Sequence, residues 1–340
     1  MQRHARALLG AMDGLLPPGV ELICLTPPEP FDPPAWQRIE VRRVGRSTGN
    51  LWEQLDLPLA ARGGLLFSPA NIGPFHYANQ VVTLHDASIY VTPQAYSRAF
   101  RAKYSFVFQQ LARRARRLLT VSAFSGGELA ERLGIAPERF TVIHNGCDHL
   151  DDILPDEAIL SKHNLQKDGY LLVVASQSAH KNLQNLFAAL QQVESPVRLI
   201  AAGGSFSRVF QSGEQRELPP NVQMTGYIHD RELKALYQNA LGLVFPSLYE
   251  GFGLPILEAM RHGCPVLSSN TASMPEVAGD AALYFNPRQP QDMARCLNHF
   301  LSDPNLRVDL RARGCARAAA FTWTVAAQKT LDVLLNVGDG

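Results

Sequence analysis

Short apolar segments alternate with longer amphipathic segments along most of this chain. The apolar segments carry few polar residues at alternate positions, which is typical of parallel strands buried on both faces of a sheet. The longer segments have helical spacing, so the alternation predicts doubly wound α/β sheets. We expect strands at residues 20–25, 64–68, 80–84, 117–121, 140–144, 170–175, 198–202, 222–225, 241–245, 265–268 and 282–284. We expect helices at residues 97–116, 125–133, 183–192, 230–239, 255–262, 291–301 and 305–319.

An acidic, polar segment at residues 147–168 separates two such series of strands and helices. We therefore expect two Rossmann-like domains, one over residues 1–165 and one over residues 166–322. Ligands of this fold class bind at the carboxyl ends of the strands, and a cleft between two facing domains is the expected site.

The composition agrees with two Rossmann-like domains and excludes several classes of function. A length of 340 residues with 46% hydrophobic residues suits two domains with buried cores. Lys and Arg total 32 against 31 acidic residues, which argues against a dedicated nucleic-acid binder. The five cysteines are widely spaced without a CxxC pair, so we expect no disulfide framework, no metal site and a reducing, cytoplasmic location. The apolar runs are too short for a helix that spans a membrane.

The most informative segment covers residues 245–260, FPSLYEGFGLPILEAM. An apolar strand ends here in a loop with two glycines, and Pro255 suits the first turn of the following helix. The helix N-terminus and the exposed loop amides form a site for an anion such as a pyrophosphate. Glu250 and Glu258 frame this site, and carboxylates accept hydrogen bonds from sugar hydroxyls. The combination suits a nucleotide sugar.

This segment resembles the donor-site signature of retaining glycosyltransferases of family 4, which have the GT-B fold. Glu250 and Glu258 have the E-x7-E spacing of that family, and the likeness extends over residues 247–287. The resemblance implies that Glu250 contacts the transferred sugar and that Glu258 holds the ribose of the nucleotide. It also places Gly251, Phe252, Gly253 and Leu254 in the donor site, with the last two offering backbone N–H groups to the phosphates.

A second part of the resemblance follows the first strand of the later domain, at residues 173–182. In the family this loop binds phosphate, which implies that Lys181 holds the donor diphosphate and that Ser176, His180 and Asn182 lie beside it. The family often has Arg at the position of Ser176 or of His180, so Lys181 here is expected to carry more of the diphosphate charge.

The resemblance reaches further in both directions. His85, in the segment TLHD at residues 83–86, stands where family members use a His to contact the transferred sugar or acceptor; a hydrogen-bonded structural His is the alternative. The segment FTW at residues 321–323 resembles the start of a final helix that returns to the first domain, so residues 323–340 would belong there. The first domain would bind the acceptor and the second the nucleotide sugar, with parallel sheets facing a cleft.

By resemblance, the chain is a hexosyltransferase that passes a sugar to a hydroxyl of a glycan or lipid-linked acceptor and keeps the anomeric configuration. The leaving diphosphate takes the acceptor proton, and neither a metal nor another cofactor is required. Similarity to bacterial mannosyltransferases favours GDP-mannose and the synthesis of a surface polysaccharide or lipopolysaccharide. A UDP- or dTDP-sugar donor and a non-catalytic partner subunit of the same fold are the alternatives. A dinucleotide-dependent oxidoreductase is disfavoured, since no G-x-G-x-x-G follows an early strand.

Residues 87–127 contain no Asp or Glu and form a basic, aromatic-rich segment. A basic amphipathic helix binds an anionic membrane surface, here the inner face of the cytoplasmic membrane; the alternative is a solvated face on a helix whose aromatics pack in the core. The basic residues are Arg98, Arg101, Lys103, Arg113, Arg114, Arg116 and Arg117.

The chain opens in an amphipathic helix, whereas members of the family begin with a strand and a Gly-rich loop. We therefore expect the first strand to be missing and the complete protein to start about 15 to 20 residues upstream of Met1.

Overall fold

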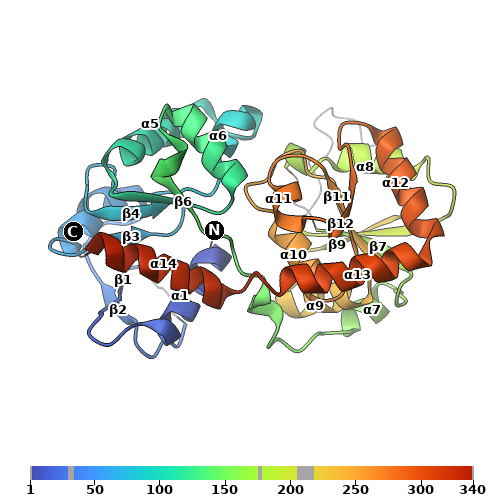
Figure 1. Cartoon of the computed structure of the whole chain (residues 1–340), viewed down its shortest axis with the longest axis horizontal. Helices are drawn as coiled ribbons and strands as arrows, with labels where there is room; N and C mark the ends of the chain where they lie inside the picture. Colours follow the sequence, from blue (N-terminus) through green and yellow to red (C-terminus); the bar gives the residue numbers. More distant parts are fainter. Residues whose placement is uncertain (1, 30–33, 175–177, 205–217, 339–340) are drawn as a thin grey trace. The chain divides into compact units, whose positions relative to one another are not determined.

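The computed structural model describes the chain except for residues 1, 30–33, 175–177, 205–217 and 339–340. The chain forms two compact units. The first contains residues up to Gly146 together with the segment from Thr322 onward, and the second runs from Cys147 to Phe321. Figure 1 shows both units as sheets covered by helices on two sides.

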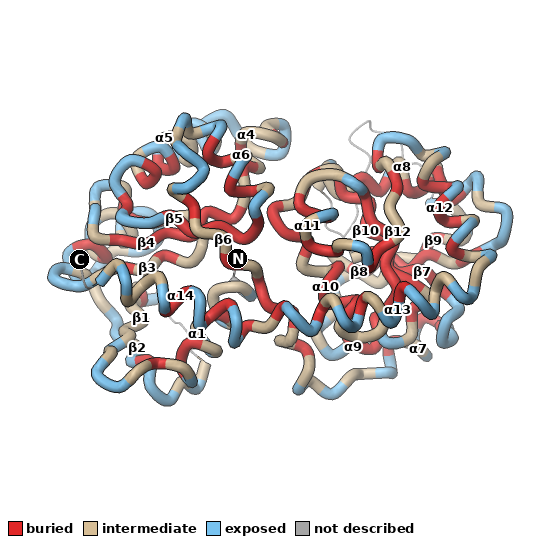
Figure 2. Tube along the Cα trace, viewed as in Figure 1, coloured by how far each residue is buried: buried red, intermediate tan, exposed pale blue. Residues whose placement is uncertain are grey.

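The first unit contains a four-stranded parallel sheet and a separate two-stranded parallel sheet. The larger sheet has the order β3-β4-β5-β6. Its central strands are buried on both faces, as their continuous apolar sequences predict (Figure 2). The strands are β1 (Ile23–Thr26), β2 (Glu40–Arg43), β3 (Leu66–Ser68), β4 (Gln80–Thr83), β5 (Arg117–Thr120) and β6 (Phe140–Val142).

Helices cover both faces of the larger sheet in the first unit (Figure 1). Residues of α5 and α6 pack on one face around Phe108 and Leu129, and residues of α1 and α14 pack on the other around Met12 and Trp323. The helices and helical turns are α1 (Gln2–Leu15), α2 (Gly49–Leu51), η1 (Trp52–Asp56), α3 (Leu57–Ala60), α4 (Ser88–Val91), η2 (Pro93–Ala95), α5 (Arg98–Arg114), α6 (Ala123–Leu133), η3 (Pro137–Arg139) and α14 (Trp323–Gly338).

The second unit is built on a six-stranded parallel sheet of order β12-β11-β10-β7-β8-β9. The chain starts at β7, builds β8 and β9 outward on one side, and then returns to place β10 on the other side. The strand order therefore reverses between β7 and β10, which is where doubly wound sheets bind ligands. The strands are β7 (Tyr170–Val174), β8 (Arg198–Ala202), β9 (Val222–Gly226), β10 (Gly242–Phe245), β11 (Val266–Ser269) and β12 (Ala282–Phe285).

Helices of the second unit also cover both faces of its sheet. Leu186 of α8 and Leu297 of α12 belong to a core cluster that includes Val173 and Val244 of the central strands. The helices and turns are η4 (Asp148–Leu150), α7 (Ala158–Lys162), η5 (Ala179–Lys181), α8 (Leu183–Leu190), α9 (Asp230–Asn239), α10 (Leu254–Arg261), α11 (Met274–Ala278), α12 (Pro290–Ser302) and α13 (Pro304–Ala318).

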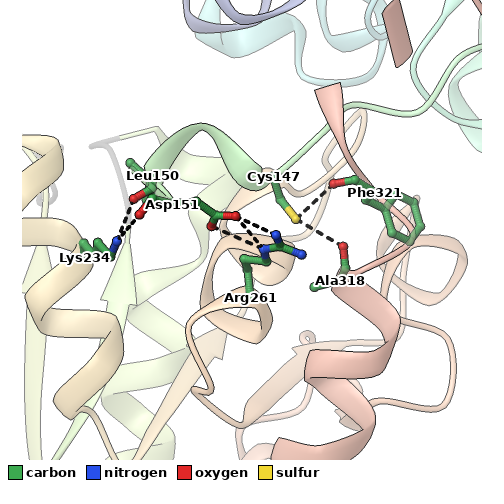
Figure 3. A network of polar contacts seen from close by, with 7 residues as sticks. All are labelled: Cys147, Leu150, Asp151, Lys234, Arg261, Ala318 and Phe321. Atoms are coloured by element: carbon green, nitrogen blue, oxygen red, sulfur yellow. Dashed lines mark hydrogen bonds and ion pairs between the residues drawn. The ribbon is translucent and has the colours of Figure 1, made fainter. Parts of the chain in front are cut away.

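The predicted boundary at residue 165 is wrong, because residues 147–165 belong to the second unit. Polar contacts attach this segment to α9 and α10 (Figure 3). Lys234 Nζ donates to the carbonyls of Leu150 and Asp151 at 2.9 and 2.7 Å, and Arg261 grips the Asp151 carboxylate with Nε–oxygen distances of 3.1 and 3.2 Å. The acidic composition suggested a break between two domains, but this segment instead contacts two cations of the second unit, Lys234 through backbone carbonyls and Arg261 through the Asp151 carboxylate.

Strand β2 (Glu40–Arg43) was not predicted from the sequence. Its residues are mostly exposed and charged, so it lacks the apolar pattern that marks the other strands. It pairs with β1 in parallel, and among the described residues no strand joins this pair to the sheet β3-β4-β5-β6.

Candidate functional site

The candidate site is centred on the loop between β10 and α10. The buried strand ends at Phe245, and the loop closes on Gly253, whose φ of 93° lies in the left-handed region that glycine adopts without strain. Pro255 follows in the first helical turn. Gly251, Phe252 and Gly253 are buried, and α10 begins directly after them at Leu254. A helix N-terminus has the partial positive charge that suits an anion.

Three hydroxyl groups, from the last residue of β11 and from the segment after it, hold the carbonyls of this loop. Ser269 donates to the carbonyl of Ser247 at 2.7 Å, and Ser273 donates to the carbonyl of Glu250 at 2.9 Å. Between them, Thr271 donates to the Leu248 carbonyl at 3.2 Å. These three residues lie within the segment that resembles the family, residues 247–287, but their carbonyl partners could be found only in the structure.

Lys181 and Glu250 lie together in the second unit. Lys181 Nζ donates to Glu250 Oε1 at 2.7 Å, and both side chains are 16% exposed. The ammonium also lies 5.4 Å from the ring centroid of Phe245, at the end of β10. The loops that carry the two residues are joined by a hydrogen bond from the Leu248 amide to the His180 carbonyl at 2.7 Å. The two residues predicted to be catalytic in this unit therefore form one partly exposed ion pair at the switch point of the sheet.

The other residues predicted in the phosphate loop have different positions. His180 belongs to η5, and its backbone makes the contact to Leu248 just described. Asn182 is buried with a φ of 58°, and its side-chain amide donates to the carbonyls of Pro246 and Pro287 at 3.0 and 2.7 Å. These bonds give Asn182 a structural task, which is to join the loops after β10 and β12. Ser176 lies outside the described residues.

Glu258 lies in α10, one turn after Leu254, and its side chain is 1% exposed. Tyr237 donates a hydrogen bond to Glu258 Oε2 at 2.9 Å, and His149 Nε2 lies 3.0 Å from Oε1. We did not single out Tyr237 or His149 from the sequence. Tyr237 reads as one apolar position of α9, and His149 as part of the acidic segment, so no local signal marked either.

Buried groups around this cluster are held in their neutral forms. Burial lowers the pKa of His262, whose ring stacks near Tyr237, to about 4. Burial raises the pKa of the thiols of Cys147 and Cys264 to about 12, so both are inert hydrophobic groups. Cys147 also contacts the carbonyls of Ala318 and Phe321 (Figure 3).

His85 lies in the first unit, just after the carboxyl end of β4. Its Nε2–H donates to the Pro69 carbonyl at 2.9 Å, and its backbone amide donates to Asn71 Oδ1. Burial lowers the pKa of His85, and burial together with His85 lowers the pKa of His4, 4.5 Å away between ring centroids, to about 3. Both imidazoles are therefore neutral at physiological pH, and the ring of His85 is held by the Pro69 carbonyl.

The basic segment of the first unit forms α5, whose N-terminus is capped by Ser97. Its basic side chains are exposed except that of Arg101, which is half-buried. Phe100 and Phe106 are exposed, while Phe108 packs in the core. No helix in the described part of the chain is long and apolar enough to cross a membrane.

A helical segment beside α5 carries an apolar stripe that we did not predict. The stripe consists of Leu51, Leu55 and Leu59, which are 64%, 55% and 54% exposed and recur every fourth residue. A hydrogen bond from the Phe75 amide to Gln54 and the contact of Phe75 with Phe106 of α5 join this segment to α5.

Two family models match separate parts of this chain. The model described as Glycosyltransferase Family 4 matches residues 1–149, and that described as Glycosyl transferases group 1 matches residues 156–317. O-antigen chain mannosyltransferase B of Escherichia coli is 32% identical over 272 residues, which cover 76% of this chain and 71% of that protein. The serotype-specific mannosyltransferase WbdA of Escherichia coli is 32% identical over 244 residues, which cover 64% of this chain and 28% of that protein.

Solved structures match nearly the whole chain at low identity. Sucrose-phosphate synthase from Thermosynechococcus elongatus aligns with a TM-score of 0.73 at 20% identity, covering 98% of this chain and 92% of that one. WaaG, a glycosyltransferase involved in lipopolysaccharide biosynthesis, aligns with a TM-score of 0.72 at 16% identity, covering 98% and 95%.

The chain is a glycosyltransferase of the GT-B fold, built from two Rossmann-like units. It belongs to glycosyltransferase family 4 and resembles the bacterial mannosyltransferases of that family. These matches confirm the predicted family, the fold and the enzyme class, a hexosyltransferase.

Proposed function

We propose that this enzyme transfers mannose from GDP-mannose, with retention of configuration, to a hydroxyl of a glycan or lipid-linked acceptor. The reaction would serve the synthesis of a surface polysaccharide or lipopolysaccharide. The observation that carries this proposal is the ion pair of Lys181 with Glu250 beside the N-terminus of α10. The names of the relatives, O-antigen chain and serotype-specific mannosyltransferases, support the sugar and the product.

The chemistry of the pair suits transfer from a diphosphate. The bond between the sugar C1 and the diphosphate oxygen breaks, and a bond from C1 to the acceptor oxygen forms on the same face. The acceptor proton moves to the departing diphosphate. Lys181 and the start of α10 stabilise the negative charge that develops on that diphosphate. No metal ion is required in this scheme, because these two groups supply the positive charge.

The donor must share Lys181 with Glu250. In the structure the ammonium is already bonded to the Glu250 carboxylate, so an arriving diphosphate would take over part of that bond. Glu250 then turns its carboxylate to the hydroxyls of the transferred sugar. A charge-assisted exchange of this kind keeps both groups paired before and after donor binding.

Replacing Glu250 tests the assignment. We expect Glu250→Ala and Glu250→Gln to reduce transfer from GDP-mannose at least about 1000-fold, because an oriented site carboxylate is lost. Product formation is measured by mass spectrometry with oligosaccharide and lipid-linked acceptors, with and without EDTA. Glu194→Ala, an exposed site in the same unit, is the control and is expected to retain full activity. Near wild-type activity in both Glu250 variants, with unchanged melting temperatures, would contradict the proposal.

The donor is tested separately by thermal shift with GDP, UDP and dTDP. We expect GDP to raise the melting temperature most, since binding to the folded state stabilises it. A larger rise in melting temperature with UDP or dTDP would mean that the donor carries that nucleotide instead of GDP, while the enzyme class would stay the same. Binding without any transfer from a full panel of donors would favour a non-catalytic partner subunit.

We also propose that the enzyme works in the cytoplasm at the inner face of the membrane. The exposed cations of α5 provide the electrostatic attraction to anionic lipid, and the exposed side chains of Leu51, Leu55 and Leu59 provide apolar groups for the interface. A location on the membrane suits a lipid-linked acceptor.

A further inference from the structure

Glu258 lies one turn into α10, beyond the helix start that would bind the diphosphate. It follows Leu254 by one turn of α10, so its side chain lies on the same face as the helix start that would bind the diphosphate. Its carboxylate is buried, and each oxygen already has a protein contact, Tyr237 on Oε2 and His149 on Oε1. A ribose hydroxyl that reaches this carboxylate must therefore share an oxygen with one of these contacts or replace that contact.

The contact with Tyr237 is a fixed one. Tyr237 is fully buried in α9, and its ring stacks near that of His262 with centroids 6.4 Å apart and planes 21° apart. Its hydroxyl donates to Glu258 Oε2 at 2.9 Å. The terminal torsion of a glutamate is broad, so a fixed donor on one oxygen sets the direction in which the other oxygen points.

The contact with His149 comes from a short turn and not from an α-helix. Its side chain is 10% exposed, at the edge of the cluster, and it belongs to the short turn η4. The backbone of this turn is attached to α9 through Lys234, which donates to the Leu150 and Asp151 carbonyls (Figure 3). The turn is therefore held in place, and His149 contacts Glu258 from this short turn, whereas Tyr237 contacts it from the packed helix α9.

We propose that Tyr237 is a positioning residue for Glu258 and that His149 occupies Oε1 until a ribose hydroxyl replaces it. This inference rests on the proposed function, in which Glu258 holds the ribose. A carboxylate offers about four acceptor positions, so Glu258 can keep Tyr237 and still accept from the ribose. A contact that exists only in the free protein must be broken when the ligand binds, so it lowers the affinity. A contact that orients the carboxylate in the bound form raises the affinity. The two residues are therefore expected to have opposite effects.

The test compares GDP with 2′,3′-dideoxy-GDP, which lacks the ribose hydroxyls, by calorimetry on the full chain. Wild type should bind GDP more tightly than the dideoxy form. Tyr237→Phe should weaken GDP binding about tenfold and leave dideoxy-GDP within about twofold. His149→Ala should strengthen GDP binding about fivefold, again without effect on dideoxy-GDP. His149→Gln retains an amide donor and should behave as wild type.

Tyr170→Phe is the matched control, because it removes another fully buried tyrosine hydroxyl, which donates to the Leu236 carbonyl at 2.8 Å. It should leave both affinities unchanged at a similar loss in melting temperature. An equal effect of Tyr237→Phe on the two nucleotides, or no effect, would overturn the positioning role. Weaker or unchanged GDP binding in His149→Ala would overturn the exchange. Equal binding of GDP and dideoxy-GDP by wild type would show that the ribose assignment of Glu258 is wrong, and no binding of GDP, UDP or dTDP would show that the proposed function is wrong.

Discussion

At the scale of single residues, the site depends on charges that are paired inside one unit. Lys181 and Glu250 come from the loops after β7 and β10, and their contact of 2.7 Å joins the group expected on the diphosphate to the group expected on the sugar. The predicted phosphate loop at residues 173–182 contains no Arg and no Lys other than Lys181. Lys181 is thus the cation on which the proposed chemistry depends most.

Replacing Lys181 tests this dependence. We expect Lys181→Ala to lower kcat about 100-fold or more, since a group that stabilises the leaving diphosphate is lost. Lys181→Arg keeps the charge with a different geometry and should recover part of the rate. The comparison is made in steady-state kinetics with Lys167→Ala, an exposed lysine of the same unit, as the control. A rate within about threefold of wild type for Lys181→Ala would contradict the assigned role.

At the scale of elements, the strand β10, its loop and α10 form a unit whose shape depends on one glycine. Gly253 has a φ of 93°, and a Cβ at this position would lie 3.3 Å from the Ile256 side chain. The left-handed conformation costs about 1–2 kcal/mol for residues other than glycine. The proposed function offers the amides of Gly253 and Leu254 to the phosphates, since Pro255 has no N–H and the Ile256 amide donates to the Gly253 carbonyl. Strain at Gly253 is therefore expected to displace the proposed anion site.

We expect Gly253→Ala to reduce the free energy of unfolding by about 1–2 kcal/mol and to weaken GDP binding. Gly127→Ala is the control, because Gly127 lies within α6, its Cβ would meet no atom within 4 Å, and alanine favours a helix. That control should gain about 0.5–1 kcal/mol. Urea unfolding and calorimetry measure both effects. Wild-type GDP affinity in Gly253→Ala would show that the loop tolerates the left-handed alanine.

The helix α5 and the leucine stripe are tested as a membrane surface. We expect wild type to sediment with vesicles that contain anionic lipid and to bind neutral vesicles weakly. Arg113→Gln with Arg114→Gln should weaken this binding about tenfold or more, since each cation near an anionic surface contributes about 1 kcal/mol. Leu51→Ser with Leu55→Ser and Leu59→Ser should weaken it as well.

The control for this experiment replaces two exposed cations of the second unit, Lys167→Gln with Arg288→Gln, and should bind as wild type does. Equal binding of wild type to neutral and anionic vesicles, or no binding to either, would argue that α5 presents a solvated face.

At the scale of the whole molecule, the chain passes between its two units twice, after Gly146 and after Phe321. The two passages contact each other on both sides. Within the second unit the Cys147 amide donates to the Phe321 carbonyl at 2.9 Å, and within the first a Cβ on Gly146 would lie 2.2 Å from the Trp323 nitrogen. Glycine at 146 is therefore required by close packing of backbone on backbone.

We expect Gly146→Ala to destabilise the protein by about 3 kcal/mol, because backbone atoms cannot move aside as a side chain can. The first unit, which contains both Gly146 and Trp323, should unfold at lower urea concentration than in wild type. Gly14→Ala, in α1 of the same unit, is the control, since a Cβ there meets no atom within 4 Å. An unchanged urea midpoint for Gly146→Ala would mean that the backbone at residues 146 and 323 moves apart at no cost in stability.

The sequence by itself determined the local features of this protein. Continuous apolar segments predicted eleven of the strands, and glycine before Pro255 predicted the turn into α10, because these features depend on backbone conformation and on burial of neighbouring residues. The exposed β2, with charged residues and one partner strand, had no such signal.

Only the tertiary structure decided which distant side chains meet. It brought Tyr237 and His149 onto Glu258, attached residues 147–165 to the second unit through Lys234 and Arg261, and used the hydroxyls after β11 to fix the loop at Glu250. Hydrogen bonds form over about 3 Å, a distance set by how helices and strands pack. The sequence pattern indicates which face of a helix or strand is buried, but it does not identify the polar group of another element that contacts that face.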